Sequence, residues 1–109
     1  LMLIVMYFQL KSNFPKYALI DKAGKTIILK NFGEYGLYVE KNIIKTQDND
    51  TYPIYIISFD KEPDYFEVST NEGATHKIEH IGNKKYHLKF VGFGFGSPII
   101  DCDFKIQAY

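Results

Sequence analysis

The sequence predicts a single all-β domain: an antiparallel β-sandwich of about eight or nine strands with an immunoglobulin-like or jelly-roll-like topology. Aromatic residues make up 17% of the 109 positions, as nine Tyr and nine Phe with no Trp, and such side chains favour strands. Turn-forming clusters recur at about ten-residue intervals, and no run shows the apolar period of a helix. A chain of this length holds one hydrophobic core, so residues 1–109 are expected to form one domain.

The first expected strand is the apolar run Leu1–Phe8, which is typical of a strand buried on both faces. The same run also fits the end of a signal peptide or membrane anchor, which would place the domain in the cell envelope or outside the cell. It is shorter than the about 20 residues that cross a bilayer as a helix, so the strand is favoured. A hairpin follows, Tyr17–Ile20 with Thr26–Leu29, and Gly24 suits the positive φ of its short loop.

Three further strands are expected in the middle of the chain: Glu34–Glu40, Tyr52–Phe59 and Tyr65–Ser69. Alternation within the first of them places Tyr35, Leu37 and Val39 on one face and Tyr38 on the other. Ile43-Ile44 is interpreted as a short apolar patch before a polar loop. The second strand is the most apolar of the three and is therefore expected to be central in its sheet.

The last third is expected to hold a hairpin and a final strand: His76–Ile81, Tyr86–Phe90 and Ile99–Tyr109. The apolar faces of the hairpin match when Ile78 lies opposite Leu88. This register separates the three histidines, because His76 and His80 share one face and His87 lies on the other. His76 and His80 are then about 13 Å apart along the strand, too far to share one ion by themselves. We therefore expect no metal site and no cofactor.

Asp101 and Asp103 offer the strongest candidate for catalysis. Residues two apart on a strand share a face at about 6 to 7 Å, a separation that overlaps the carboxylate pairs of glycosidases. Catalytic carboxylates also need a pocket that tunes their pKa, which spacing alone does not supply. Cys102, on the opposite face, is expected to be a buried packing group.

The glycine-rich segment Gly92–Gly96 resembles a phosphate-binding loop only superficially. It lacks the Lys-Ser/Thr pair and the following helix that such loops need. Phe93 and Phe95 point to one layer, while the glycines leave the other face bare for a neighbouring backbone or ring. Such a strip could also accept a flat partner, including an added strand from another protein.

The charge pattern limits the classes of partner. The formal net charge is zero, and all 13 basic residues are Lys. Without Arg or a basic excess, specific recognition of nucleic acid or phosphate is not expected. Cys102 is the single cysteine, so an internal disulfide and a CxxC site are excluded.

Tyrosine supplies rigid amphipathic contact area at interfaces, and several tyrosines lie on the expected strands. We therefore predict a non-catalytic binding or structural module that contacts a protein or a carbohydrate, with its binding site at Tyr35, Tyr38, Phe93 and Phe95. One alternative is a small hydrolase or metal-dependent enzyme that uses Asp101, Asp103 and the histidines. Another is a small inhibitor or immunity protein. A membrane contact is expected only if residues 1–8 are the remnant of an anchor. No residue pattern identifies a family.

Overall fold

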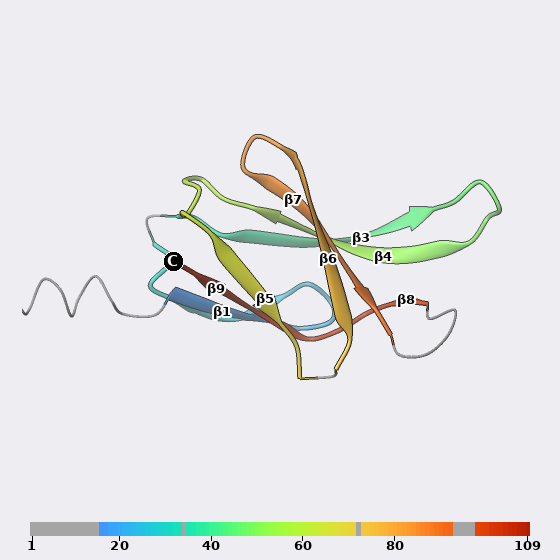
Figure 1. Ribbon diagram of the computed structural model, residues 1–109, viewed down its shortest axis with the longest axis horizontal. Helices are drawn as coiled ribbons and strands as arrows, with labels where there is room; N and C mark the ends of the chain where they lie inside the picture. The colour runs from blue at the N-terminus through green and yellow to red at the C-terminus, as the bar shows by residue number, and fades with distance from the viewer. Residues whose placement is uncertain (1–15, 34, 72, 93–97) are drawn as a thin grey trace, which may run out of the picture.

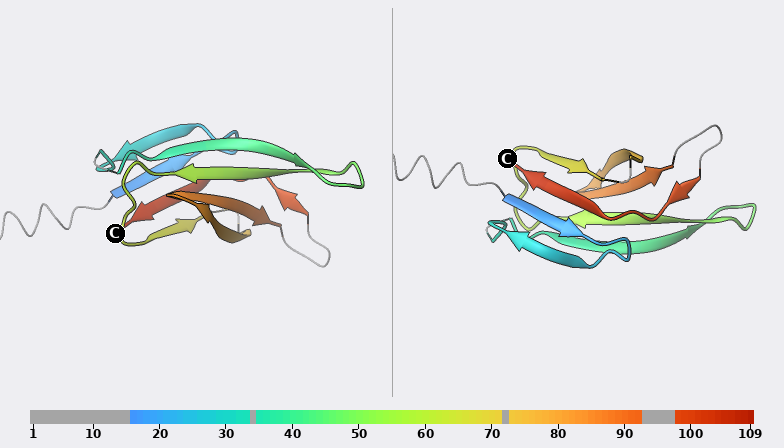
Figure 2. Two further views of the ribbon diagram at one scale, coloured as in Figure 1. Left: turned by 90° about the horizontal axis from the view of Figure 1, so that it is seen from above. Right: turned by 90° about the horizontal axis from the view of Figure 1, so that it is seen from below.

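The computed structural model describes residues 16–33, 35–71, 73–92 and 98–109, and this part of the chain forms two antiparallel sheets packed together (Figures 1 and 2). It contains nine strands and no helix: β1 (Lys16–Ile20), β2 (Thr26–Lys30), β3 (Tyr38–Lys45), β4 (Thr51–Ser58), β5 (Phe66–Ser69), β6 (Thr75–Gly82), β7 (Lys85–Val91), β8 (Ile99–Ile100) and β9 (Phe104–Ala108). The predicted all-β, two-sheet architecture is confirmed. The predicted strand Leu1–Phe8 lies outside the described residues.

The four-stranded sheet has the order β2-β1-β9-β5. Its hairpin β1-β2 matches the prediction, and Gly24 in the connecting loop adopts a φ of 88°. A Cβ atom at this glycine would lie 2.9 Å from the Cβ of Lys41. The loop therefore needs glycine both for its backbone conformation and for its close approach to β3.

The five-stranded sheet has the order β3-β4-β7-β6, and β8 pairs with Phe90 and Val91 of β7, next to the stretch of β7 that pairs with β4. As predicted, β4 lies between two neighbours. The β6-β7 hairpin also has the predicted register, with Ile78 opposite Leu88. Lys84 in its turn has a φ of 62°.

The predicted strand Glu34–Glu40 is wrong in its position, because β3 begins at Tyr38 and extends to Lys45. The carbonyl of Phe32 accepts hydrogen bonds from the amides of Tyr35 and Gly36, and Gly36 has a φ of 56°. This tight turn is incompatible with an extended chain. The apolar patch Ile43-Ile44 belongs to β3, where it pairs with β4.

The predicted final strand Ile99–Tyr109 is divided into two strands. β8 pairs with β7 in one sheet, whereas β9 lies between β1 and β5 in the other. Residues 101–103 cross from one sheet to the other, and the side chain of Cys102 is buried at the crossing. The apolar residues on both sides of the crossing mimic one continuous strand, so alternation alone does not reveal the break.

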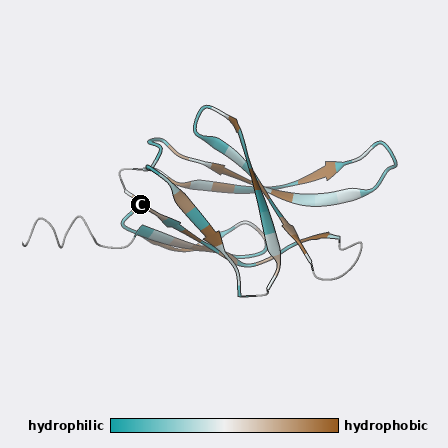
Figure 3. Ribbon diagram, viewed as in Figure 1, coloured by the Kyte–Doolittle hydropathy of each residue, from teal (hydrophilic) through white to brown (hydrophobic). Residues whose placement is uncertain are grey.

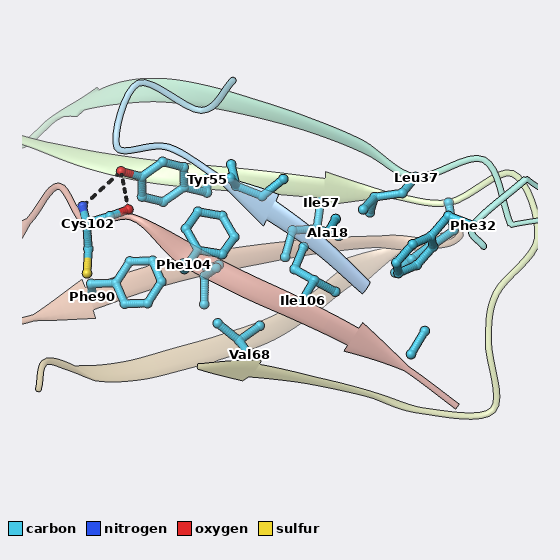
Figure 4. Close-up of a cluster of buried hydrophobic side chains, with 14 residues drawn as sticks. Ala18, Phe32, Leu37, Tyr55, Ile57, Val68, Phe90, Cys102, Phe104 and Ile106 are labelled. Carbon is cyan, nitrogen blue, oxygen red and sulfur yellow. Dashed lines mark hydrogen bonds between the residues drawn. The ribbon is translucent and has the colours of Figure 1, made fainter. Parts of the chain in front are cut away.

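The core lies between the two sheets, as Figure 4 shows. Hydrophobic and hydrophilic residues alternate along strands such as β5 and β9, which directs one set of their side chains inward (Figure 3). At its centre the rings of Tyr55, Phe90 and Phe104 contact one another with centroid distances of 5.0 to 5.7 Å. Such tilted and edge-to-face pairs stabilise a core beyond the area that they bury.

Candidate binding surface

The outer surface of the four-stranded sheet is open to solvent and carries a mixed set of side chains. Ala18, Ile106 and Val68 lie in one row across β1, β9 and β5 and are buried, so their chain neighbours point outward. We call these outward residues the four-stranded outer face: Tyr17, Leu19, Ile28, Lys30, Glu67, Ser69, Lys105 and Gln107, with Tyr65 and Tyr109 at one end.

A groove of about 330 Å³ lies at the opposite end of this face, where β1 and β5 end and β9 begins. Leu19, Ile27 and Phe104 supply apolar surface, and Ile27 is 63% exposed. The polar residues of the lining are Ser69, Thr70, Asn71, Asp103 and Lys105. An apolar floor with a polar rim is typical of the surfaces that bind other molecules.

The tyrosine rings of this face are already in contact with other groups. The ammonium groups of Lys105 and Lys30 lie over the ring of Tyr17, at 5.2 and 5.7 Å from its centroid. Tyr65 and Tyr109 stack on each other at a centroid distance of 4.6 Å and an angle of 11°. Both residues are exposed, so the stacked pair adds accessible aromatic surface to the face.

One buried tyrosine fixes the rim of the groove. The hydroxyl of Tyr55 donates a hydrogen bond to the carbonyl of Lys22 at 2.8 Å. It also accepts one from the amide of Cys102 at 3.2 Å and lies 3.4 Å from the carbonyl of the same residue (Figure 4). The hydroxyl of Thr70 donates to the carbonyl of Asp103 at 2.9 Å and contacts the sulfur of Cys102. These bonds hold the crossing segment 101–103 against the β1-β2 loop and the end of β5.

Burial raises the pKa of the Tyr55 hydroxyl from its ordinary value of 10.0 to about 12. Because the folded protein holds this proton more tightly than the unfolded chain, its contribution to stability is complete below pH 10 and is lost as the pH rises towards 12. We expect a decrease of about 2 to 3 kcal/mol in the free energy of unfolding over that range. Denaturant unfolding at successive pH values measures it, and a constant free energy would contradict the assignment.

The two acidic residues proposed for catalysis each have a structural partner. Asp101 forms an ion pair with Lys41 at 2.8 Å, and Asp103 accepts a hydrogen bond from the backbone amide of Lys22 at 2.6 Å. They lie in the crossing segment rather than on a strand, so the inference that they share one strand face is wrong. Cys102, between them, is buried as expected.

The histidines are separated as the predicted register requires. His76 and His80 lie opposite Phe90 and Tyr86 on one face of the sheet, and His87 points to the other face. Among residues 16–33, 35–71, 73–92 and 98–109, no three His, Cys, Asp or Glu side chains gather where they could hold a metal ion.

A second groove, of about 350 Å³, is lined by residues 62–66, Ile78 and Tyr86. The Tyr86 hydroxyl bonds to the Glu62 carboxylate, and the His80 ring stacks on Tyr86 at 4.8 Å. Burial raises the pKa of Tyr86 to about 12, with a smaller contribution from the hydrogen bond to Glu62 and its negative charge. The hydroxyl therefore stays protonated at neutral pH and acts as a hydrogen-bond donor rather than as a base.

Two of the predicted binding residues, Tyr35 and Tyr38, meet at the loop after β4 but not on the four-stranded outer face. Tyr38 is 59% exposed, and its hydroxyl donates to Asp60 at 3.3 Å. Tyr35 is half-buried against Phe32, and its carbonyl accepts the amide of Asp60. The other two, Phe93 and Phe95, lie outside the described residues.

Comparisons with protein-family models, with curated protein sequences and with solved structures found no match for this chain. The described part also contains no helix long and apolar enough to cross a membrane.

Sequence reasoning missed the four-stranded outer face because the face depends on β9 lying between β1 and β5. Its signal in the sequence is the alternation of Tyr17 and Leu19 with buried neighbours, and of Lys105 and Gln107 with Ile106. That alternation identifies the outward residues of each strand but not which strands are neighbours.

Proposed function

We propose that this chain is a non-catalytic binding module that contacts a protein partner through the four-stranded outer face. The observation that carries the proposal is the apolar groove of Leu19, Ile27 and Phe104, which opens onto this face beside a polar rim. Protein interfaces combine an apolar centre with a polar rim and are enriched in tyrosine. The edges of Tyr65 and Tyr109 add such contact area at the other end of the same face.

A protein partner fits the tyrosines of this face better than a carbohydrate does. Sugars bind aromatic residues by lying flat on a free ring face. Here Lys30 and Lys105 lie over the ring of Tyr17, and the stacked rings of Tyr65 and Tyr109 each cover one face of the other. Ring edges and hydroxyl groups are parts of tyrosine that protein partners contact readily.

An inhibitor or immunity protein also acts through a contact surface of this kind, so inhibition of the bound protein is consistent with the proposed function. This function does not require a particular topology. The likeness to immunoglobulin-like or jelly-roll-like domains is proposed only at the level of two packed antiparallel sheets.

Hydrolase activity is disfavoured by the structural partners of Asp101 and Asp103.

Site-specific photo-crosslinking tests the proposal. A photoreactive residue replaces Gln107 on the four-stranded outer face, and a matched control replaces Asn42 on the outer surface of the five-stranded sheet. In an extract of the source cells we expect one discrete protein adduct from position 107 and none from position 42. The further substitution Leu19→Asp places a charge in the groove and should reduce the adduct about tenfold.

Three results would contradict the proposal: equal crosslinking from both positions, an adduct that Leu19→Asp leaves unchanged, and turnover of an ester, glycoside or phosphate substrate. A glycan array supplies the remaining comparison. Binding to a glycan that Leu19→Asp abolishes would replace the protein partner with a carbohydrate.

A further inference from the structure

β6 forms one margin of the five-stranded sheet, and all eight of its residues are exposed. One edge pairs with β7 along nearly its whole length. Figure 1 shows the turn that joins the two strands into a hairpin. No described strand pairs with the other edge. Free edges of this length present a row of unpaired amide and carbonyl groups, which makes them templates for an added strand.

The inner side of β6 is only partly covered in the described part of the chain, where residues 62–66 line a groove with Ile78. Ile78 faces the same side as Leu88, which is fully buried, yet Ile78 itself is 37% exposed. The opposite sheet ends at β5, whose Phe66 packs against Tyr86 of β7 at 4.9 Å rather than against β6. β6 therefore extends beyond the opposite sheet, and its unpaired edge is accessible to a further strand.

The sequence of β6 is complementary to itself when two copies pair antiparallel about Ile78. In that register Lys77 of one protomer lies opposite Glu79 of its partner, and the reciprocal pair forms on the other side of the two-fold axis. Ile78 lies opposite its own copy. Directly opposite residues of unlike charge and apolar residues both stabilise a strand pair.

Neighbouring registers lack this complementarity. Centring the pair on Lys77 places two lysines opposite each other, and centring it on Glu79 does the same with two glutamates. Like charges directly opposite destabilise a strand pair. Lysine on an edge strand ordinarily discourages pairing with another chain. Here the two-fold axis places Glu79 of the partner opposite Lys77, so the two charges attract.

We infer that two copies of this chain associate through antiparallel pairing of their β6 edges, centred on Ile78. The two five-stranded sheets then continue into one sheet across the two-fold axis. This inference goes beyond the proposed function and is independent of it. The four-stranded outer face stays open in both copies, so the dimer presents two such faces.

Sedimentation velocity of the 109-residue protein tests this inference between about 1 µM and about 1 mM, the range in which small interfaces associate. The apparent mass of the wild type is expected to increase with concentration, from the monomer mass of 12.7 kDa towards twice that value. Lys77→Glu and Glu79→Lys each convert two attractive pairs into repulsive ones and should each raise the dissociation constant about tenfold. The double variant Lys77→Glu/Glu79→Lys should restore wild-type association.

The control variant is Lys45→Glu, an exposed charge change on β3 at the other margin of the sheet, which should leave association unchanged. Circular dichroism checks that every variant keeps its strand content. Amide hydrogen exchange should show protection of residues 75–80 that increases with protein concentration. A wild type that stays monomeric, single variants that associate normally, or a double variant that fails to recover would each overturn the inference.

Discussion

Replacing Tyr55 with Phe is expected to lower the free energy of unfolding by about 2 kcal/mol, although the substitution removes a single oxygen atom. The lost hydroxyl bridges the carbonyl of Lys22 and the amide of Cys102. A buried backbone group without a partner costs about 1 to 3 kcal/mol, because it has lost its hydrogen bonds to water and gains none in the protein. The ring stays in place, so the core packing against Phe90 and Phe104 is kept.

Denaturant unfolding of the wild type and of Tyr55→Phe measures this loss, with an unchanged dependence on denaturant concentration. Tyr52→Phe is the matched control, since it removes the same atom from a partly exposed ring on the outer side of β4. We expect a change of less than about 0.5 kcal/mol there. Equal effects at the two positions would show that the bridge does not hold the crossing segment.

The second large effect is expected from Gly36→Ala, with a loss of about 2 to 3 kcal/mol. Gly36 has a φ of 56°, which is unfavourable for alanine. The added Cβ would also collide with the carboxylate of Asp60 and lie 2.9 Å from its Cβ. Asp60 cannot move away freely, because its amide donates to the carbonyl of Tyr35 at 2.7 Å.

Gly33→Ala in the same turn is the control for this effect. A Cβ at Gly33 would meet no atom within 4 Å, and this glycine is not among those with a positive φ. Thermal or denaturant unfolding should therefore detect a change of less than about 1 kcal/mol, of either sign. A similar loss from both substitutions would contradict the role assigned to Gly36.

Local patterns were sufficient to predict the hairpins. In both the β1-β2 and the β6-β7 hairpins, a short loop joins strands that are adjacent in sequence, so matching apolar faces also matches the register. The position of Ile78 opposite Leu88 follows directly. The separation of the histidines was predictable for the same reason.

The errors arose where the conformation depends on distant residues. Alternation through Glu34–Glu40 looked like a strand, but Gly36 turns the chain and is held by Asp60 from the loop after β4. The apparent strand Ile99–Tyr109 changes sheets at Cys102, because Tyr55 and Thr70 bind the crossing segment. Neither partner can be identified from the residues next to the break.

The candidate site was likewise predictable only in its local features. Tyr38, which the sequence analysis placed on the face opposite Tyr35 and in the predicted binding site, is exposed. Tyr35 is half-buried, because the turn after Phe32 folds its ring against the end of the sandwich. The four-stranded outer face could not be predicted, since it is assembled by long-range pairing of β9 with β1 and β5.

The position of β9 is the claim on which the proposed function depends, and solution NMR tests it most directly. Nuclear Overhauser contacts should connect Ile106 to Ala18 on one side and to Val68 on the other, because these residues are cross-strand partners. That result would place Tyr17, Gln107 and Glu67 in one row on a single face. If residues 104–108 instead contact β7, as one continuous strand from Ile99 would, the four-stranded outer face does not exist.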